Sequence, residues 1–308
     1  MKINQKVSII INCKNGDKTL FDAINSVVLQ TYSRWELILF DNNSKDRSIN
    51  IAKSFKDKRI KIFKNNKSMK LGVSRFYAFK KATGDYLCFL DTDDIWLPDK
   101  LMHQLKFFRN RDVGAVYTNS IFFNNKKSFI LYKNRQVSGY IFRNLLNKYH
   151  ISFDTIIFKI SFLENNNIQI DKKFNVIHDL DLILRLSKEC KIIYCPKVLS
   201  KWRMSETSDS FNKKKTIIKE KFLLYKKLLN LTKEKKYISN LINFKEKTVE
   251  EKILFEIFSK KSFNFAELKK LKLGLKSIFI HILYFVPFKK ILFKIIRKIF
   301  PTKLMFDI

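Results

Sequence analysis

Glycine and proline are both scarce in this 308-residue sequence, which contains 6 glycines and 4 prolines. Lysine, asparagine, isoleucine and phenylalanine are abundant instead, a composition that an A/T-rich genome produces without any functional cause. Hydrophobic residues still make up 46% of the chain and aromatic residues 14%, so the chain can bury a core and is not globally disordered. We expect one large α/β domain with an appendage, or two modest domains.

Cysteine is scarce too, and its spacing argues against structural bridges. The four cysteines, Cys13, Cys88, Cys190 and Cys195, are scattered and form no C-x-x-C pair. We therefore expect buried, reduced thiols rather than disulfides or zinc ligands. Because the N-terminus also lacks a signal-peptide pattern, the sequence predicts a cytoplasmic protein.

Long apolar runs are absent. The first run covers only residues 7–11, and the longest, residues 278–288, contains His281 and Pro287. A helix that crosses a bilayer needs about 20 predominantly apolar residues. We therefore expect no transmembrane helix.

Acidic residues are few beside basic ones, with 28 Asp+Glu against 62 Lys+Arg and a net charge of +34. Such a charge attracts anionic partners, whether nucleic acid, a membrane face or phosphorylated substrates. Composition alone explains part of it. No recognised nucleic-acid-binding motif is present, so we expect no nucleic-acid partner.

The basic charge is concentrated toward the C-terminus. Residues 211–308 hold 25 Lys+Arg and 8 Asp+Glu, and they show helical spacing without strand alternation. We place a boundary near residues 210–215. The prediction is one domain of residues 1–212 and a basic α-helical extension of residues 213–308.

Short apolar runs alternate with helix-like segments before residue 100. The strand-like runs cover residues 7–11, 36–40, 59–63 and 86–90, and the helix-like segments cover residues 18–30, 48–55 and 73–82. This alternation predicts an α/β fold with a mostly parallel sheet and helices on both faces. Beyond residue 114 the pattern is mixed, with strand-like residues 115–123 and 154–159 and a helix around residues 180–188.

Polar clusters follow each of the expected strands. They read "NCKNG" at 12–16, "DNNSKD" at 41–46, "SMKLGVSR" at 68–75 and "DTDD" at 91–94. Ligands of open parallel sheets bind at the carboxyl ends of the strands. The sequence therefore predicts a ligand site where these clusters meet.

The "DTDD" cluster places Asp91, Asp93 and Asp94 directly behind an apolar strand. One of them could begin the next helix, or the cluster could be a solvated acidic loop. Three carboxylates together fit better as oxygen ligands for Mg²⁺ or Mn²⁺, with phosphate oxygens and water completing the coordination.

Several motifs, taken together, resemble family 2 glycosyltransferases of the type that builds bacterial cell-surface glycans. They are "QTY" before an aromatic-Glu strand, "LGVSR", "DTDDIWLP" and "DLDLILRL", in this order. The resemblance covers residues 6 to about 210. It implies the GT-A nucleotide-diphospho-sugar transferase fold, a nucleotide-sugar donor and a glycan acceptor.

The resemblance assigns roles to the acidic cluster. It implies that Asp93 coordinates the Mn²⁺ or Mg²⁺ that bridges the diphosphate, with Asp91 as a further ligand near the ribose or donor sugar and Asp94 as support for the loop. Arg75 matches a basic position close to the donor, although a salt bridge to the acidic cluster is an equal alternative.

The resemblance also assigns the later motifs. It implies that Asp179 is the catalytic base that deprotonates the acceptor hydroxyl, the alternative being a helix N-cap. Asp181, two residues on, points elsewhere and is structural. Trp202, Arg203 and Ser210 match a loop that closes over the donor.

The positions expected to bind the nucleotide depart from the family pattern. Asn12 and Lys14 stand where the family has a Thr or Pro and a Tyr that stacks on the base, and Asp41 is followed by Asn42 instead of a second Asp. An asparagine amide can still accept and donate hydrogen bonds to a base. The donor is expected to be a UDP-sugar.

Residues 288–300, "FKKILFKIIRKIF", carry one apolar stripe at helical spacing and a cationic opposite face. The pattern predicts either an interfacial helix on an anionic membrane or a surface helix packed on the core. We favour the first, and therefore expect a peripheral protein on the inner face of the cell membrane.

The sequence as a whole predicts an inverting, metal-dependent glycosyltransferase that acts on a lipid-linked glycan acceptor in bacterial surface polysaccharide synthesis. A degenerate, non-catalytic member of the fold is the alternative, because His178 and Ser205 also replace the family's usual Glu and His. A nucleotidylyltransferase is disfavoured, since "NCKNGDK" lacks the glycine-rich loop of that class.

Overall fold

The computed structural model describes residues 5–124, 126–204, 212–232 and 234–259. The amphipathic stretch 288–300, Ser205 and Ser210 lie outside these ranges. Within them, none of the helices combines the length and the apolarity that crossing a bilayer requires.

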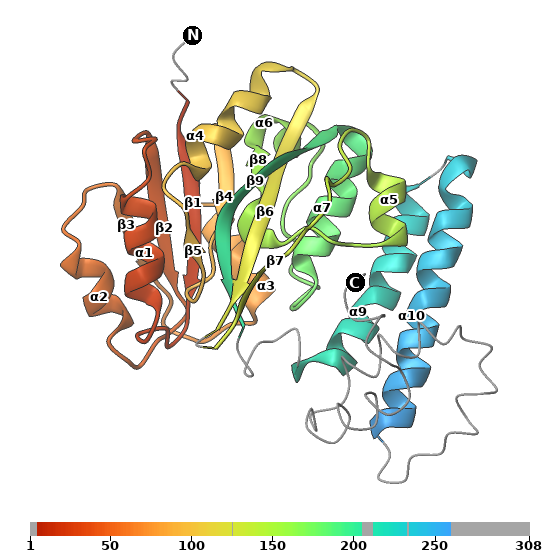
Figure 1. Cartoon of the computed structure of the whole chain (residues 1–308). Coiled ribbons are helices and arrows are strands. Elements are labelled where there is room, and N and C mark those ends of the chain that lie inside the picture. Colours follow the sequence, from red (N-terminus) through yellow and green to blue (C-terminus); the bar gives the residue numbers. More distant parts are fainter. Residues whose placement is uncertain (1–4, 125, 205–211, 233, 260–308) are drawn as a thin grey trace.

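The first third of the chain alternates strands and helices, as predicted (Figure 1). Its elements are β1 (Val7–Cys13), α1 (Leu20–Val28), β2 (Trp35–Asp41), α2 (Ser48–Ser54), β3 (Ile60–Lys64), α3 (Leu71–Phe79), β4 (Tyr86–Phe89), β5 (Ile95–Trp96) and α4 (Lys100–Leu105).

The remainder is mixed. Its elements are η1 (Lys106–Arg109), β6 (Val113–Phe123), β7 (Ser128–Ile130), α5 (Phe142–Asn147), η2 (Phe153–Thr155), β8 (Ile157–Lys159), α6 (Ile160–Asn165), α7 (His178–Glu189), β9 (Lys191–Arg203), α9 (Lys214–Leu231), η3 (Lys235–Tyr237) and α10 (Ile238–Ser259). The sequence pattern predicts α7 but not the short helices α5 and α6, which are too brief to show a full amphipathic period.

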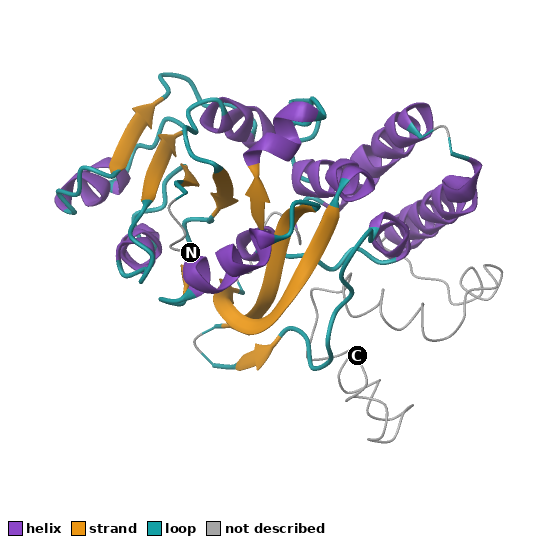
Figure 2. Cartoon of the chain, turned by 90° about the horizontal axis from the view of Figure 1, so that it is seen from above, coloured by secondary structure: helices purple, strands orange, loops and turns teal. Residues whose placement is uncertain are grey.

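All strands belong to one sheet in the order β3-β2-β1-β4-β8-β6-β9-β5, with β7 paired to β6. Strands β3, β2, β1 and β4 are parallel, as are β6 and β9, whereas β8 is antiparallel to both of its neighbours. The predicted α/β architecture, with helices on both faces of the sheet, is confirmed (Figures 1 and 2).

The two faces of the sheet carry separate hydrophobic cores, because successive strand residues point to opposite sides. On one face, Val7, Ile9 and Ile11 of β1 pack against α1. On the other, Ile10 belongs to a core shared with α5, α7, α9 and α10. The last two helices lie side by side at one end of the molecule (Figure 1). All four cysteines are buried and unpaired, as predicted.

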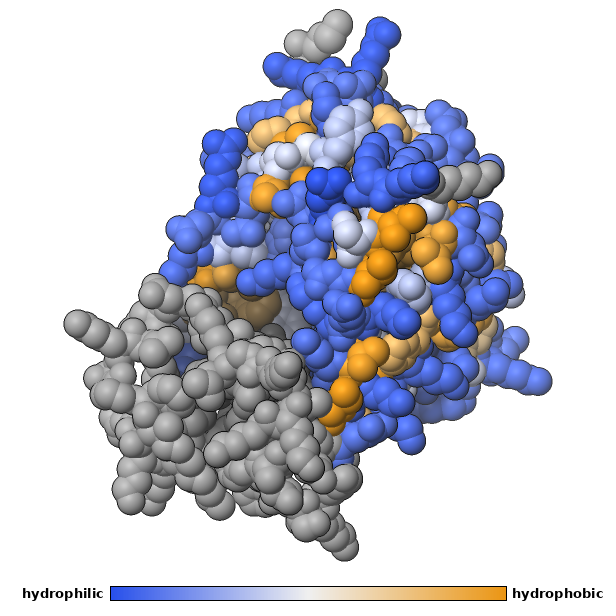
Figure 3. Space-filling view, turned by 90° about the vertical axis from the view of Figure 1, so that its right-hand side faces the viewer, coloured by the Kyte–Doolittle hydropathy of each residue, from blue (hydrophilic) through white to orange (hydrophobic). Residues whose placement is uncertain are grey.

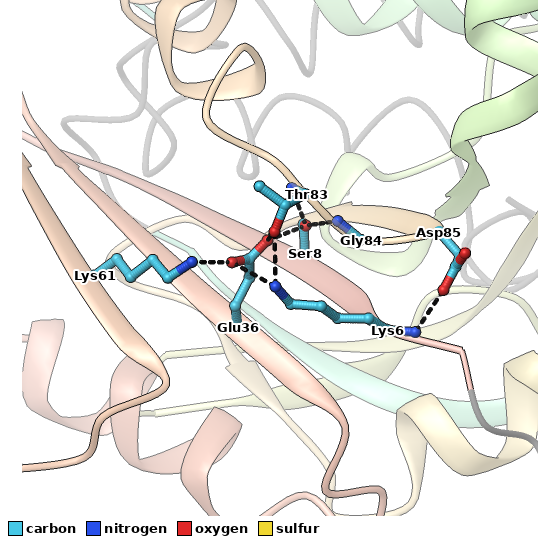
Figure 4. A network of polar contacts seen from close by, with 7 residues as sticks. All are labelled: Lys6, Ser8, Glu36, Lys61, Thr83, Gly84 and Asp85. Carbon is cyan, nitrogen blue, oxygen red and sulfur yellow. Dashed lines mark hydrogen bonds and ion pairs between the residues drawn. The ribbon is translucent and has the colours of Figure 1, made fainter.

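A polar network fixes the amino ends of β1, β2 and β4, at the edge opposite the polar clusters (Figure 4). The buried Glu36 carboxylate accepts hydrogen bonds from Ser8 and Thr83 and forms ion pairs with Lys6 and Lys61. Burial alone raises the pKa of Glu36, but these partners outweigh it and lower the pKa to about 2. The network holds the parallel strands in register, so that their carboxyl ends meet at one place.

Candidate active site

The polar clusters do converge, and a cavity of about 720 Å³ opens where they meet. Seven of the residues expected to act in catalysis, metal binding or nucleotide binding line it, namely Asn12, Lys14, Arg75, Asp91, Asp93, Asp179 and Trp202, and Asp94 and His178 line it as well. The acidic cluster comes from the loop after β4 and Asp179 from the first turn of α7. The structure therefore brings together carboxylates that lie far apart in the sequence.

Arg75 joins the two halves of this cavity. Its buried guanidinium donates to the Asp91 carboxylate and lies within hydrogen-bond distance of His178 Nε2. It also lies over the ring of Phe153, 5.0 Å from its centroid. Burial lowers the pKa of His178, and the Arg75 charge lowers it further, so this histidine is neutral and accepts the bond. The salt bridge between Arg75 and the acidic cluster, which was one of the two alternatives for Arg75, is therefore present.

A close backbone approach places Arg75. A Cβ on Gly72 would lie 1.8 Å from the Phe174 carbonyl oxygen, so only glycine fits at this point of α3. Beside it, the Leu71 N–H donates to Asn175 Oδ1 at 2.8 Å. These contacts fasten the start of α3 to the segment that leads into α7, which keeps the guanidinium between Asp91 and His178.

The three carboxylates of the acidic cluster differ in their surroundings. Asp94 is buried and accepts the Arg203 backbone N–H at 3.0 Å. Asp93 is half-buried, and burial together with the Asp91 charge raises its pKa to about 6. Neither begins a helix, because β5 follows directly and α4 starts at Lys100. The helix-start alternative for this cluster is wrong.

The cluster fits a cation only in part. Among the described residues, no three His, Cys, Asp or Glu side chains are grouped as ligands for a metal ion. One oxygen of Asp91 is held by Arg75, and the Asp93 carboxylate has no ion-pair partner in the described part of the chain. Mg²⁺ is commonly held by one or two carboxylates plus substrate phosphates. Asp93 and Asp91 fit that arrangement. The described residues do not surround a metal ion with protein ligands alone.

Asp179 occupies the second position of α7 and is partly buried. Ile177 precedes the helix, so the N-cap alternative for Asp179 is wrong. Tyr149 donates its hydroxyl hydrogen to Asp179 Oδ2 at 3.0 Å. Burial raises the pKa of Asp179, while backbone hydrogen bonds, Arg75 and Tyr149 oppose that rise. A carboxylate with a raised pKa that forms no ion pair with any described residue is suited to accept a proton.

Asp181, by contrast, has a structural place. Its fully buried carboxylate forms ion pairs with Arg185 at 2.6 Å and with Lys227 of α9 at 2.7 Å. It does not line the cavity that contains Asp179.

Three of the predicted nucleotide-binding residues do not line the cavity. The Asp41 carboxylate accepts the Ser44 N–H, and Asn42 exchanges two hydrogen bonds of 2.8 Å with the backbone of Met69. Arg203 Nε donates to the Asp93 carbonyl oxygen at 3.0 Å. All three side chains form hydrogen bonds here with backbone groups of the loops that surround the cavity.

The expectation that Trp202 and Arg203 lie in a loop is wrong. Both belong to the end of β9, which pairs with β6 through Phe123. The Trp202 ring packs 4.7 Å from the Phe122 ring and forms part of the cavity wall. The extended pairing of β6 and β9 explains the difference, because alternation in "KVLSKWR" is too short to mark the strand's end.

Sequence reasoning missed the segment 149–155, which supplies Tyr149, Phe153 and Asp154 to the cavity. Asp154 is 4% exposed, and its Oδ2 has no hydrogen-bond partner among the described residues. The segment precedes β8, which runs antiparallel to β4. The start of β8 therefore lies beside the end of β4. A prediction of this antiparallel pairing would have placed the segment 149–155 next to the acidic cluster.

Comparison with known proteins places the chain in a family. The model of glycosyl transferase family 2 matches residues 8–166. The Escherichia coli protein "UDP-Glc:alpha-D-GlcNAc-diphosphoundecaprenol beta-1,3-glucosyltransferase WfgD" is 31% identical over 215 residues, covering 68% of this chain and 82% of the relative.

Solved structures share the fold at lower identity. S. aureus TarS 1-349 in complex with UDP-GlcNAc has a TM-score of 0.60 at 17% identity, covering 88% of this chain and 77% of that one. The mannosyltransferase PcManGT from Pyrobaculum calidifontis, in complex with GDP-Man and Mn²⁺, has a TM-score of 0.62 at 13% identity, covering 92% and 86%. Both are GT-A glycosyltransferases, which confirms the predicted GT-A fold.

Proposed function

Because this chain belongs to glycosyl transferase family 2, we propose that it transfers a sugar, with inversion, from a UDP-sugar to a lipid-linked glycan acceptor. The observation that carries the proposal is the single cavity lined by both Asp179 and the acidic cluster. One end of it offers a base for the acceptor, and the other offers carboxylates where a diphosphate would be held.

In this proposal Asp179 takes the proton from the acceptor hydroxyl as that oxygen attacks the anomeric carbon of the donor. The attack comes from the side opposite the leaving nucleotide and therefore inverts the configuration. The Tyr149 hydroxyl, which donates to Asp179 Oδ2, orients the carboxylate and leaves its other oxygen for the acceptor.

The leaving nucleoside diphosphate gains negative charge during transfer. Mn²⁺ or Mg²⁺ held by Asp93 and Asp91 would neutralise that charge without a proton transfer. Arg75 is a second cation close to the diphosphate, and neutral His178 leaves its charge undiminished.

The nucleotide is proposed to lie along Asn12 and Lys14. The Asn12 Oδ1 is buried without a hydrogen-bond partner among the described residues, while its amide nitrogen donates to Ser74 Oγ at 2.8 Å. An unpaired acceptor oxygen in this position suits an N–H of a base or a ribose hydroxyl. Asp41 and Asn42 would then act by shaping the loops around the base. Trp202, which lines the cavity, would cover the donor, and Arg203 would support the acidic loop through the Asp93 carbonyl.

The acceptor class follows from the relative WfgD, whose name states an acceptor sugar linked to diphosphoundecaprenol. We propose an acceptor of the same chemical class here, a sugar joined through a diphosphate to a long isoprenoid, in the synthesis of a bacterial surface polysaccharide.

A donor screen tests this function. The purified chain is incubated with each of several UDP-, GDP- and dTDP-sugars, with Mn²⁺, Mg²⁺ or EDTA, and released nucleoside diphosphate is measured. We expect cation-dependent release from a UDP-sugar. Absence of release from every donor would favour the degenerate, non-catalytic alternative.

The same proposal places the protein on the inner face of the cell membrane, through the cationic and apolar faces of residues 288–300 in the sequence. Each cation near an anionic surface contributes about 1 kcal/mol. Replacing Lys289, Lys290, Lys294, Arg297 and Lys298 by glutamine should therefore weaken binding to phosphatidylglycerol vesicles at least about a hundredfold. Co-sedimentation measures this, with phosphatidylcholine vesicles as control. Equal sedimentation of both proteins would count against membrane attachment through this segment.

A further inference from the structure

Asp179 borders a second cavity. This space of about 430 Å³ lies between α5, α7, α9 and α10, and we call it the C-terminal helix cavity. Tyr149, Val176 and Asp179 line both it and the cavity of the acidic cluster. The proposed base thus stands on a wall shared by two spaces. The nucleotide-sugar donor would occupy the cavity of the acidic cluster. The C-terminal helix cavity is then available to the acceptor.

One part of the wall of the C-terminal helix cavity is apolar, and the rest carries polar or charged side chains. Leu145 and Leu146 come from α5, Leu180 from α7, Ile217 from α9 and Phe244 from α10. Helices α9 and α10 also expose apolar side chains to solvent. Figure 3 shows separate apolar patches among the hydrophilic residues of one face of the molecule. The apolar part of the wall suits a ligand with a hydrocarbon part.

The charges of this cavity favour an anion. Lys221 is paired with Glu251 at 2.6 Å. Lys247 donates to the Asn147 carbonyl oxygen at 2.6 Å, and neither Lys247 nor Lys148 forms an ion pair with any residue that the structure describes. Two lysines that form no ion pair with a described residue therefore line a partly apolar space beside the base.

We propose that the C-terminal helix cavity binds the diphosphate of the acceptor and the first isoprene units attached to it. Lys148 and Lys247 would bind the phosphate oxygens, and the leucine and phenylalanine side chains would contact the hydrocarbon. The acceptor sugar then lies next to Asp179. At about 430 Å³ the cavity holds only the head of a long isoprenoid, and the rest of the chain stays in the membrane. This inference rests on the proposed transfer to a lipid-linked acceptor.

The first test measures binding without turnover. Farnesyl diphosphate is titrated against the full chain in EDTA, so that no cation occupies the acidic cluster, and compared with farnesol and with inorganic pyrophosphate. We expect the K148Q/K247Q double variant to bind farnesyl diphosphate at least about tenfold more weakly than the wild type. The K148R/K247R variant should retain binding. Thermal unfolding of K148Q/K247Q, compared with that of the wild type, excludes a folding defect.

A matched control removes the same charge elsewhere. Lys219 and Lys226 are exposed on α9 and do not line the cavity, so the K219Q/K226Q variant should bind like the wild type. Equal binding by K148Q/K247Q and this control would overturn the inference. So would pyrophosphate binding as tightly as farnesyl diphosphate, because the apolar walls would then have no part.

The second test uses turnover with a farnesyl-diphosphate-linked sugar and with the same sugar on a neutral alkyl chain. We expect K148Q/K247Q to raise the KM for the first acceptor about tenfold or more and to leave nucleotide release in the absence of acceptor unchanged. Equal KM values would overturn the inference although transfer itself occurs. Farnesyl diphosphate binding that depends on the two lysines, without turnover on any acceptor, would refute the proposed transfer but support the lipid-diphosphate site.

Discussion

Replacing Asp179 by asparagine should lower the rate of sugar transfer by about a hundredfold to ten-thousandfold, the range typical of a lost general base. Asparagine keeps the shape and the hydrogen bond from Tyr149 but cannot take up a proton at pH 7. The donor is held by other residues, so nucleotide binding should change little. Turnover and isothermal titration with UDP measure the two effects separately.

Asp181→Asn is the informative comparison. Its carboxylate is fully buried between Arg185 and Lys227, and removing one partner of a buried ion pair costs about 3–5 kcal/mol of stability. This variant should therefore lower the free energy of unfolding, which Asp179→Asn should not. A turnover of Asp179→Asn within tenfold of the wild type would contradict the assignment of the base.

The pH profile gives an independent check on Asp179. The base must be ionised, so kcat/KM falls as the pH drops through its pKa, and burial raises that pKa above the usual value near 3.9. The Tyr149 hydroxyl bond opposes the rise. Tyr149→Phe should therefore move the acidic limb of the profile to higher pH. An unchanged limb would show that another group controls it.

The parallel half of the fold was predictable because each buried strand is a short apolar run closed by a polar cluster. Both faces of β1 and β2 are covered, so they read as continuous apolar segments. Parallel strands end at the same edge, and this alone indicates that "NCKNG" and "DTDD" meet. The contact between Arg75 and His178, which connects that edge to α7, depends on the packing of Gly72 on Phe174 and leaves no trace in spacing.

The second half was less predictable because its site residues arrive through antiparallel and non-local pairing. Tyr149 reaches Asp179 from a loop before β8, which has no periodic pattern of its own. Trp202 lies near the end of the long strand β9, which pairs with β6 through several register shifts. The position of Lys148 and Lys247 in one cavity beside Asp179 follows only from the packing of α5 and α10. From composition alone, these lysines are only part of the general excess of basic residues.

Replacing Asp93 by asparagine should abolish the increase in UDP affinity produced by Mn²⁺ and reduce transfer by about a hundredfold or more, since charge neutralisation by a cation is worth several kcal/mol in the transition state. Titration of UDP in Mn²⁺ and in EDTA measures the first effect. Asp112→Asn is a matched control, because Asp112 is exposed beside Lys191 and away from the cavity. It should behave as the wild type.

The stability of Asp93→Asn separates loss of a ligand from loss of structure. Burial and the charge of Asp91 raise the pKa of Asp93 to about 6. The ionised form still predominates at pH 7, but it is less stable in the folded protein than in the unfolded chain. A neutral amide removes that repulsion, so the cation-free variant should unfold at the same temperature as the wild type or a higher one. An intact, equally stable variant that kept its full response to Mn²⁺ would exclude Asp93 as the ligand. A stable Asp93→Asn variant that no longer responded to Mn²⁺ would support Asp93 as a ligand of the cation. The negative charge of the acidic cluster would then be neutralised by a cation that binds together with the diphosphate.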